Sequence, residues 1–298
     1  MNNIAEVNNK CAPNITNDNL SCLSMSILEA LAEKYITGYI KNSLSKSELL
    51  DALNKKMSTC NGEHKCWLQI SGNTKHIDKY YLPNGPEKQF DWLSTLDINK
   101  VLQQYEIKFP EFYFVGAVPY DFEDLPDIYN LLDFDKIKLL NKHIVGLVIN
   151  LDEHYKSGSH WVALYINLKK YEIYFFDSVG KKPKSRIFKF IYNVIQYMYL
   201  SKYKETILIQ DIKLYSSYNK QKISDPLKNK YFTQLKHIKA KYNNIQHQKE
   251  NTECGVYSIH CIVSLLYNID FENIIKNPIS DERMNKYRTK IFYNSNYK

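Results

Sequence analysis

The sequence predicts an α+β protein in which helices flank a central sheet of mixed or antiparallel strands. Three runs rich in β-branched and aromatic residues follow one another at residues 144–149, 161–166 and 171–176, and each has the length and the bounding residues of a strand. The last two runs are separated by Asn167-Leu168-Lys169-Lys170, which is short enough for an antiparallel hairpin. Apolar residues at helical spacing precede and follow the three runs, so helices are expected before and after them in the chain.

The first part of the chain predicts a helical arm that is separate from the sheet. Apolar residues recur at helical spacing from about Cys22 to Tyr35. The stretch Ser45-Lys46-Ser47-Glu48 has the pattern of a capping box ahead of a second short helix. Pro83-Asn84-Gly85-Pro86 then stops both helix and strand ladder. We therefore place a domain boundary near residue 88, with an N-terminal arm at 1–88 and a core domain at 89–298.

The remaining elements of the core domain are expected from apolar periodicity and from capping residues. They are a helix at Asp91–Tyr105, a strand at Glu111–Val118, an amphipathic helix at Ser185–Lys202, a strand at about Thr206–Gln210, a largely apolar helix at Gly255–Tyr267 and a last helix that ends at Phe292. Ser280-Asp281-Glu282 provides a cap and first-turn acids for this last helix.

The charge of the chain is unevenly distributed. The net charge is +8, and residues Lys181–Lys241 contain 15 Lys and Arg against 3 Asp and Glu. A local excess of this kind can bind the phosphate backbone of DNA, and the interleaved tyrosines could stack on bases. The alternative is a solvated lysine face, which is the usual role of a charge run.

The six cysteines are thinly spread and do not resemble a dense disulfide framework, so a reducing compartment is the simpler interpretation. Cys60, His64 and Cys66 could supply three zinc ligands, but no close fourth ligand follows and the spacing matches no common zinc motif. We expect no metal and no other cofactor. The N-terminus lacks a signal sequence, and no apolar stretch is long enough for a membrane helix. A soluble protein that is not secreted is expected.

Cys254 is a candidate nucleophile because it begins the apolar helix, where unpaired N–H groups and the positive end of the helix dipole favour a thiolate. Cysteine is also one of the most buried residue types, and for Cys261 on the same helix we expect a packing role. A thiol enzyme needs an imidazole within hydrogen-bond reach and a third group that holds the ring. His160, which precedes one strand of the hairpin, and Asp177, which follows the other, suit these two roles.

Gln248 is a candidate for stabilising the oxyanion. It precedes Cys254 by six residues, and its side-chain amide could donate a hydrogen bond alongside backbone N–H groups near the nucleophile. Gln246 and Asn251 also carry amides and lie nearby, so the local pattern alone leaves the choice among the three open.

Taken together, His160-Trp161, Asp177-Ser178, Gln248 and Cys254-Gly255 resemble the motifs of a family of cysteine proteases that includes the SUMO-deconjugating enzymes and the adenovirus protease. The chain order excludes the papain arrangement, in which Cys comes first. The resemblance covers the chain from about residue 90 to the C-terminus. It implies a sheet flanked by helices, with the nucleophile at a helix N-terminus.

Within this family the chain is most similar to the virion-maturation proteases of African swine fever virus and other large DNA viruses. The similar segments include Thr252–Ser258, Asp281–Thr289 and, in the arm, Ser21–Ser24. The swine fever enzyme has Asn as its orienting residue, whereas this chain has Asp177, as the deconjugating enzymes do.

The resemblance also suggests substrate-binding residues. In the deconjugating enzymes two tryptophans enclose the Gly-Gly tail of the substrate. Trp161 matches the tryptophan that follows the catalytic His, and Trp92 resembles the other. Two flat indoles over a chain without side chains would exclude any residue bulkier than Gly. The alternative for Trp92 is a core anchor on a helix face.

The main hypothesis is a thiol endopeptidase that cleaves after Gly-Gly-type sequences in viral structural polyproteins, within virions and host cytoplasm. The first alternative is a protease of ubiquitin-like or SUMO conjugates. The second is a basic nucleic-acid-binding structural protein in which Lys181–Lys241 forms the functional surface and the protease site is vestigial. A protease that uses DNA as an activator, like the adenovirus enzyme, would combine the two activities.

Overall fold

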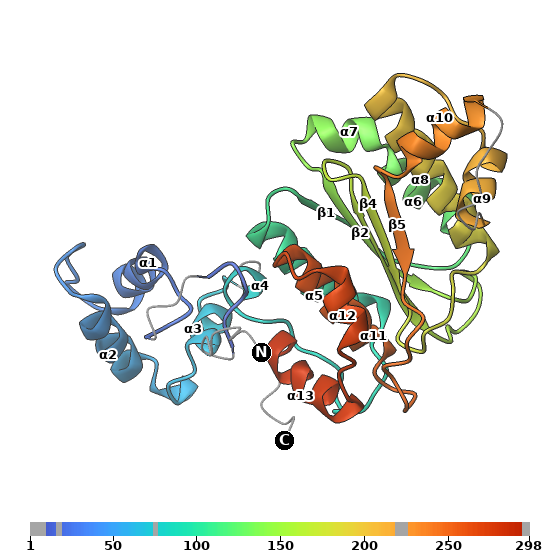
Figure 1. The fold of residues 1–298 in the computed structure, drawn as a ribbon. Helices are drawn as coiled ribbons and strands as arrows, with labels where there is room; N and C mark the ends of the chain where they lie inside the picture. The colour runs from blue at the N-terminus through green and yellow to red at the C-terminus, as the bar shows by residue number, and fades with distance from the viewer. Residues whose placement is uncertain (1–9, 16–19, 74–76, 218–225, 294–298) are drawn as a thin grey trace. The chain divides into compact units, whose positions relative to one another are not determined.

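The structure is a computed structural model that describes residues 10–15, 20–73, 77–217 and 226–293. The chain divides into two compact units (Figure 1). One comprises residues 1–85 together with 288–298, and the other comprises residues 86–287. The division into an arm at 1–88 and a core at 89–298 stays a prediction.

The first unit is helical. Its elements are α1 (Met25–Tyr35), α2 (Lys46–Lys56), η1 (Ser58–Cys60), α3 (His64–Ile70) and α4 (Ile77–Tyr80). The capping box predicted from the sequence is present, because the Ser45 side chain accepts from the Glu48 backbone N–H and the Glu48 carboxylate accepts from the Ser45 backbone N–H. Leu28, Leu31, Leu49, Leu53 and Trp67 are buried together in a core of the unit's own.

Two disulfides join cysteines in this unit, which corrects our expectation of unpaired thiols. Cys11 is bonded to Cys22, and Cys60 to Cys66. Pairing of Cys60 with Cys66 also removes them as metal ligands. No cluster of three or more metal-binding side chains occurs in the described parts of the chain. The sequence interpretation failed because cysteines that are few over 298 residues can still be concentrated in one small unit.

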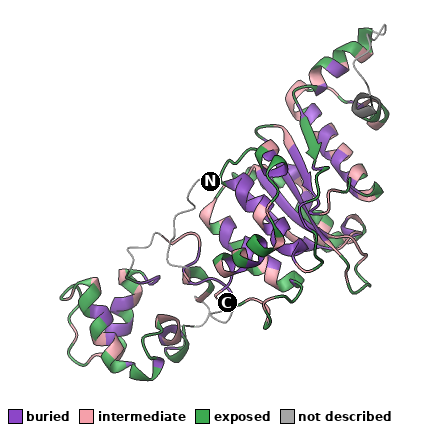
Figure 2. Cartoon of the chain, turned by 60° about the horizontal axis from the view of Figure 1, so that its bottom comes forward, coloured by how far each residue is buried: buried purple, intermediate pink, exposed green. Residues whose placement is uncertain are grey.

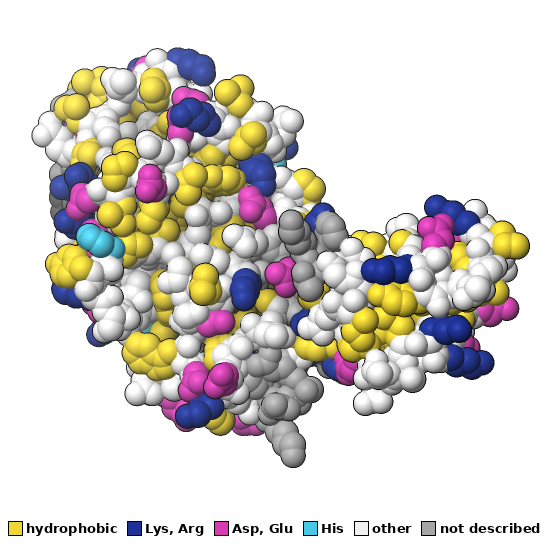
Figure 3. Space-filling view, turned by 180° about the vertical axis from the view of Figure 1, so that it is seen from behind, with side chains coloured by type: hydrophobic (Ala, Val, Ile, Leu, Met, Phe, Trp, Pro, Cys, Tyr) yellow, Lys and Arg dark blue, Asp and Glu magenta, His cyan; other side chains and the backbone are white. Residues whose placement is uncertain are grey.

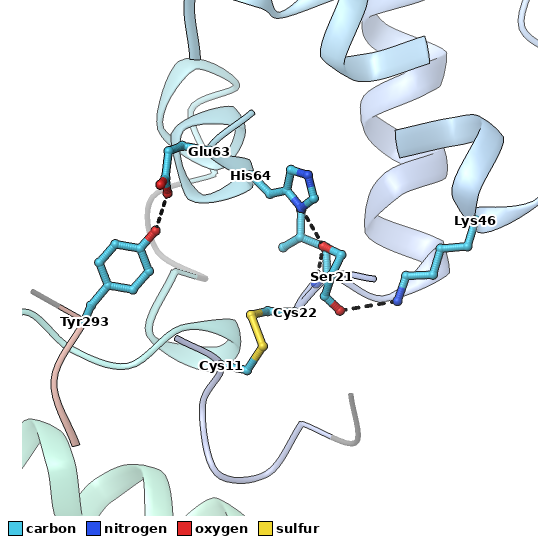
Figure 4. Close-up of a disulfide and its surroundings, with 8 residues drawn as sticks. Cys11, Ser21, Cys22, Lys46, Glu63, His64 and Tyr293 are labelled. Atoms are coloured by element: carbon cyan, nitrogen blue, oxygen red, sulfur yellow. Dashed lines mark hydrogen bonds between the residues drawn. A yellow bond between two sulfur atoms is a disulfide. The ribbon is translucent and has the colours of Figure 1, made fainter. Parts of the chain in front are cut away.

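Polar contacts surround the Cys11–Cys22 disulfide (Figure 4). The Ser21 hydroxyl lies 2.9 Å from Nδ1 of His64, and its Oγ accepts from the backbone N–H of Leu23. Lys46 donates to the backbone carbonyl of Ser21. Ser21, which directly precedes Cys22, is thereby tied to helices α2 and α3.

The second unit is built on a five-stranded mixed sheet, as predicted. Its strands, in spatial as well as sequence order, are β1 (Phe112–Val118), β2 (Ile144–Asn150), β3 (Trp161–Asn167), β4 (Glu172–Phe176) and β5 (Lys239–Tyr242). The two outer pairs are parallel and the two inner pairs are antiparallel. Strands β2 and β3 are buried on both faces, which explains their nearly continuous apolar sequences. Figure 2 shows these buried strands as the centre of the unit.

Helices cover both faces of the sheet. In chain order, the remaining elements are α5 (Thr95–Lys108), η3 (Phe122–Asp124), α6 (Pro126–Tyr129), η4 (Asn130–Leu132), α7 (Phe134–Leu139), α8 (Ser185–Tyr203), α9 (Ile209–Ser217), α10 (Pro226–Leu235), α11 (Cys254–Leu266), α12 (Phe271–Lys276) and α13 (Asp281–Ile291). Helices α5 and α11 pack on one face, over β1 to β3. The amphipathic helix α8 packs its buried side chains with those of the opposite face. Helix α11 is apolar on nearly all sides because sheet and helices enclose it.

One predicted strand is wrong. Residues 206–210 do not form a strand, and α9 begins at Ile209. The position beside β4 is filled by β5, whose sequence Lys-Ala-Lys-Tyr has all four side chains exposed. An edge strand without an apolar face gives no periodic signal, and a short apolar run such as Ile207-Leu208 cannot be assigned from periodicity alone.

The basic segment at 181–241 provides several partners for nearby acids. Arg186 pairs with Asp124, Lys230 with Glu205, Lys239 with Glu172, and Lys241 with Glu272. Residues 218–225 of the segment lie outside the described residues. Basic and acidic side chains are interspersed on the face drawn in Figure 3. DNA binding by this segment stays a prediction. Within the described ranges, no helix is long and apolar enough to cross a membrane.

Candidate active site

The nucleophile candidate, Cys254, is the first residue of α11 and is buried. N–H groups in the first turn of a helix have no partner within that helix and point toward its N-terminal end. The next residue must be small, because a Cβ on Gly255 would lie 3.0 Å from the Leu93 Cβ. The segment that contains Leu93 therefore packs directly against the start of α11.

The hairpin of β3 and β4 brings His160 and Asp177 together. Ala163 lies opposite Phe176 in the register, so the residue before β3 and the residue after β4 reach the same edge of the sheet. Nε2 of His160 lies 2.7 Å from Oδ1 of Asp177. The same carboxylate oxygen accepts from the backbone N–H of Val179 at 3.0 Å. Because Nε2 is engaged with Asp177, Nδ1 is the ring nitrogen that remains for a proton from the thiol.

The surroundings of His160 favour its charged form. Burial by itself lowers the pKa of an imidazole. Here the hydrogen bonds with Asp177 and Cys254, together with the charges of these two groups, outweigh burial and raise the pKa of His160 to about 9. The imidazole thus lies near both the carboxylate and the sulfur. An imidazole held between a thiol and a carboxylate can take the proton of the thiol.

Asn243, which sequence reasoning missed, holds the backbone of Asp177. Its Oδ1 accepts from the Asp177 N–H at 2.8 Å, and its Nδ2 donates to the Asp177 carbonyl at 2.7 Å and to the Ile245 carbonyl at 3.0 Å. The Asn243 side chain is fully buried. It follows β5 directly, so the edge strand positions the residue that is bonded to the imidazole of His160. No local pattern marks this asparagine in a chain rich in Asn.

Gln248 is buried next to the residue that follows Asp177. Its side-chain Oε1 accepts a hydrogen bond from the Ser178 hydroxyl at 2.6 Å. The Ser178 carbonyl accepts from the backbone N–H groups of His247 and Gln248. Gln246, by contrast, is exposed and donates to the Gln248 carbonyl, and Asn251 is exposed. Of the three amides that the sequence leaves open, Gln248 is the one that lies buried beside the Asp177-Ser178 segment.

A groove of about 610 Å³ begins beside these residues, and both predicted tryptophans line it. Trp161 directly follows His160 and donates from its indole N–H to the Leu93 carbonyl at 2.9 Å. Trp92 precedes α5 in the chain and is 46% exposed, so it is not a core anchor on a helix face. The predicted helix begins later than expected, because Ser94 and Asp97 form a capping box that starts it at Thr95.

Apolar and polar side chains both line the groove. The apolar ones include Val118, Pro119, Leu125 and Ile128, and the polar ones include Asp152, His154 and Lys156. A groove with this mixed lining suits a polypeptide, which presents both apolar side chains and backbone polar groups.

A thiol at a helix start, an imidazole bonded to a carboxylate at a sheet edge and an adjoining peptide-sized groove together define a cysteine protease. The profile described as "Ulp1 protease family, C-terminal catalytic domain" matches residues 133–297. The chain belongs to the Ulp1 protease family, which confirms the family that the motifs indicate.

Viral proteins are among its relatives. The chain is 32% identical over 212 residues to a thiol protease of Acanthamoeba polyphaga mimivirus, covering 70% of this chain and 59% of the mimivirus protein. It is 26% identical over 300 residues to a cysteine protease of African swine fever virus, covering 95% of this chain and 94% of that protein. The crystal structure of an African swine fever virus protease has the same fold, with a TM-score of 0.62, 23% identity and 95% of each chain covered.

Proposed function

We propose that this protease is an endopeptidase that cleaves after Gly-Gly-type sequences, and that its substrates are viral structural polyproteins processed during virion maturation. One observation carries the proposal. His160, which is bonded to Asp177 and lies near Cys254, is followed directly by Trp161, and Trp161 and Trp92 line one groove. A passage between two indoles admits a glycine backbone and excludes bulkier residues.

In the proposed reaction, Nδ1 of His160 takes the proton of the Cys254 thiol, and the sulfur attacks the carbonyl carbon of the second glycine. The oxyanion that forms is stabilised by N–H groups at the start of α11 and by the side-chain amide of Gln248. His160 then donates its proton to the leaving amine as the C–N bond breaks. Water hydrolyses the resulting thioester, again with His160 as the base. Asp177 holds the ring and stabilises its charge.

The first test uses a peptide that carries Gly-Gly-Xaa from a virion polyprotein, beside variants with Gly-Ala-Xaa and Ala-Gly-Xaa. We expect cleavage after the second glycine only in the parent peptide. Cys254→Ala should abolish cleavage, whereas Cys261→Ala is the matched control and should remain active. Cys261 is fully buried, and burial raises its thiol pKa well above the ordinary range. An active Cys254→Ala variant would refute the proposal.

A second candidate activity is removal of ubiquitin-like proteins. A relative from African swine fever virus, 26% identical over 300 residues, is named a SUMO-1 cysteine protease. Such modifiers would reach the same groove through a Gly-Gly tail. SUMO and ubiquitin fusions assayed at the same concentration as the polyprotein peptide distinguish the two. A kcat/KM at least about tenfold higher for a fusion, equivalent to about 1.4 kcal/mol of transition-state binding, would favour deconjugation.

The same assays test DNA as an activator or ligand. A duplex added at low salt should raise kcat/KM if the basic segment at 181–241 has the role predicted from its charge. Turnover that DNA does not change would remove this prediction without affecting the protease itself.

A further inference from the structure

We infer that Ser178 is a positioning residue that fixes the direction of the Gln248 amide. This inference rests on the proposed role of Gln248 in the oxyanion hole. Ser178 and Gln248 are both buried, with 1% and 2% of their surfaces exposed. The Ser178 hydroxyl donates to Oε1 of Gln248 at 2.6 Å, across 70 residues of sequence. A hydrogen bond this short between buried groups constrains the orientation of both.

An amide has two chemically different ends, and only one of them can stabilise an oxyanion. The carbonyl oxygen only accepts hydrogen bonds, whereas the NH₂ group donates two. If the amide rotated by half a turn, Oε1 would face the developing negative charge and repel it. The 2.6 Å separation suits an O–H···O bond and is shorter than an N–H···O bond usually is, so Oε1 faces Ser178 and Nε2 is the free end. Within the described residues, Nε2 has no hydrogen-bond partner, so its two N–H groups are free to donate.

The backbone of Ser178 contributes in a way that a side-chain substitution does not disturb. Its carbonyl accepts from the N–H of His247 at 2.8 Å and from the N–H of Gln248 at 2.9 Å. These bonds hold the loop at 247–248 in place whatever the side chain at position 178. Ser178→Ala therefore removes the fixed direction of the amide and leaves the loop docked.

The dipeptide Asp177-Ser178 thus has two separate roles. Asp177 faces His160, and Ser178 faces Gln248. One corner after β4 sets both the charge of the base and the direction of the oxyanion donor. The two residues begin a turn closed by the bond from the Gly180 N–H to the Asp177 carbonyl at 2.8 Å, and in a turn neighbouring side chains point in different directions.

The test measures kcat and KM of Ser178→Ala, Gln248→Ala and the double variant on the Gly-Gly peptide. We expect Ser178→Ala to lower kcat about threefold to tenfold, the equivalent of one ordinary hydrogen bond, with KM unchanged. In the Gln248→Ala background the serine substitution should have no further effect, because no amide remains to be directed. Ser264→Ala, another buried serine, is the matched control and should keep the parental kcat.

A second measurement excludes a merely structural role. Alkylation of Cys254 by iodoacetamide needs the thiolate and His160 but forms no oxyanion. Its rate should be the same in Ser178→Ala as in the parent. Slower alkylation in Ser178→Ala would overturn the inference. So would a parental kcat in Ser178→Ala, or a serine substitution that lowers kcat equally in the parent and in Gln248→Ala. If Gln248→Ala itself retained parental kcat, the proposed oxyanion role of Gln248 would fail instead.

Discussion

Replacing Asp177 by Asn tests whether this carboxylate sets the charge of His160. The substitution keeps the shape of the side chain and removes its negative charge. In the parent, burial lowers the pKa of His160, but the bonds and charges of Asp177 and Cys254 raise it to about 9. A raised pKa means that the imidazolium persists up to about pH 9 and is lost as the pH rises through that value.

The size of the effect follows from the distance. An opposite charge within about 4–6 Å shifts a pKa by about 1–3 pH units, and the His160 and Asp177 side chains are 2.7 Å apart. The alkaline limb of kcat/KM should therefore move down by about 1–3 pH units in Asp177→Asn. The contribution of the His160–Asp177 pair to the free energy of unfolding depends on pH in the same direction. This contribution is complete below the ordinary histidine pKa and is lost as the pH rises through the pKa of His160 in the folded protein.

The assay is the pH profile of kcat/KM on the Gly-Gly peptide, repeated with iodoacetamide inactivation of Cys254. Asp121→Asn is the matched control, since Asp121 pairs with His154 at 2.6 Å in a comparable geometry. The inactivation profile of this control should match that of the parent. An alkaline limb that stays within about 0.3 pH units of the parent in Asp177→Asn would refute the reasoning.

Three further predictions concern packing and stability. Gly255→Ala should reduce kcat/KM at least about tenfold, because its Cβ would lie 3.0 Å from the Cβ, 3.2 Å from the Cδ1 and 3.3 Å from the Cγ of Leu93. Leu93→Ala in the same chain removes the Cγ and Cδ1 contacts but keeps the Cβ contact, so it should restore only part of the loss. Asn243→Ala should lower the free energy of unfolding in urea by roughly 2–5 kcal/mol, since it leaves two backbone groups of Asp177 unpaired; a change below about 1 kcal/mol would contradict this. Reduction of the Cys11–Cys22 disulfide, whose cysteines are 11 residues apart, should destabilise the first unit by roughly 2–3 kcal/mol. Hydrogen exchange in α1 that does not change when reductant is added would contradict this prediction.

The candidate triad could be read from sequence because each member stands at the end of an element with a clear period. His160 precedes a strand, Asp177 follows the next strand and Cys254 begins an apolar helix. A short hairpin brings two strand ends to one edge, so even the juxtaposition of His160 and Asp177 was accessible. The closeness of Cys254 to this edge was suggested by the family resemblance, because no local rule relates a helix to a distant hairpin.

Other features gave no signal in the sequence. Strand β5 has four exposed residues and no apolar face, so its pairing with β4 cannot be seen before folding. The same is true of the cysteine pairs, since the arm brings together residues whose spacing matches no familiar pattern.

The sequence by itself determined the types of the elements that have clear apolar periodicity, the order of the candidate catalytic residues and the class of chemistry, because apolar periodicity and residue chemistry are local properties of the chain. The tertiary structure alone decided which amide lies beside the Asp177-Ser178 corner and what holds that corner in place. Ser178 meets Gln248 across 70 residues, and Asp177 meets Asn243 across 66. Contacts over such separations depend on how the whole sheet assembles, and the free energy that fixes them comes from burial, which no single segment can supply.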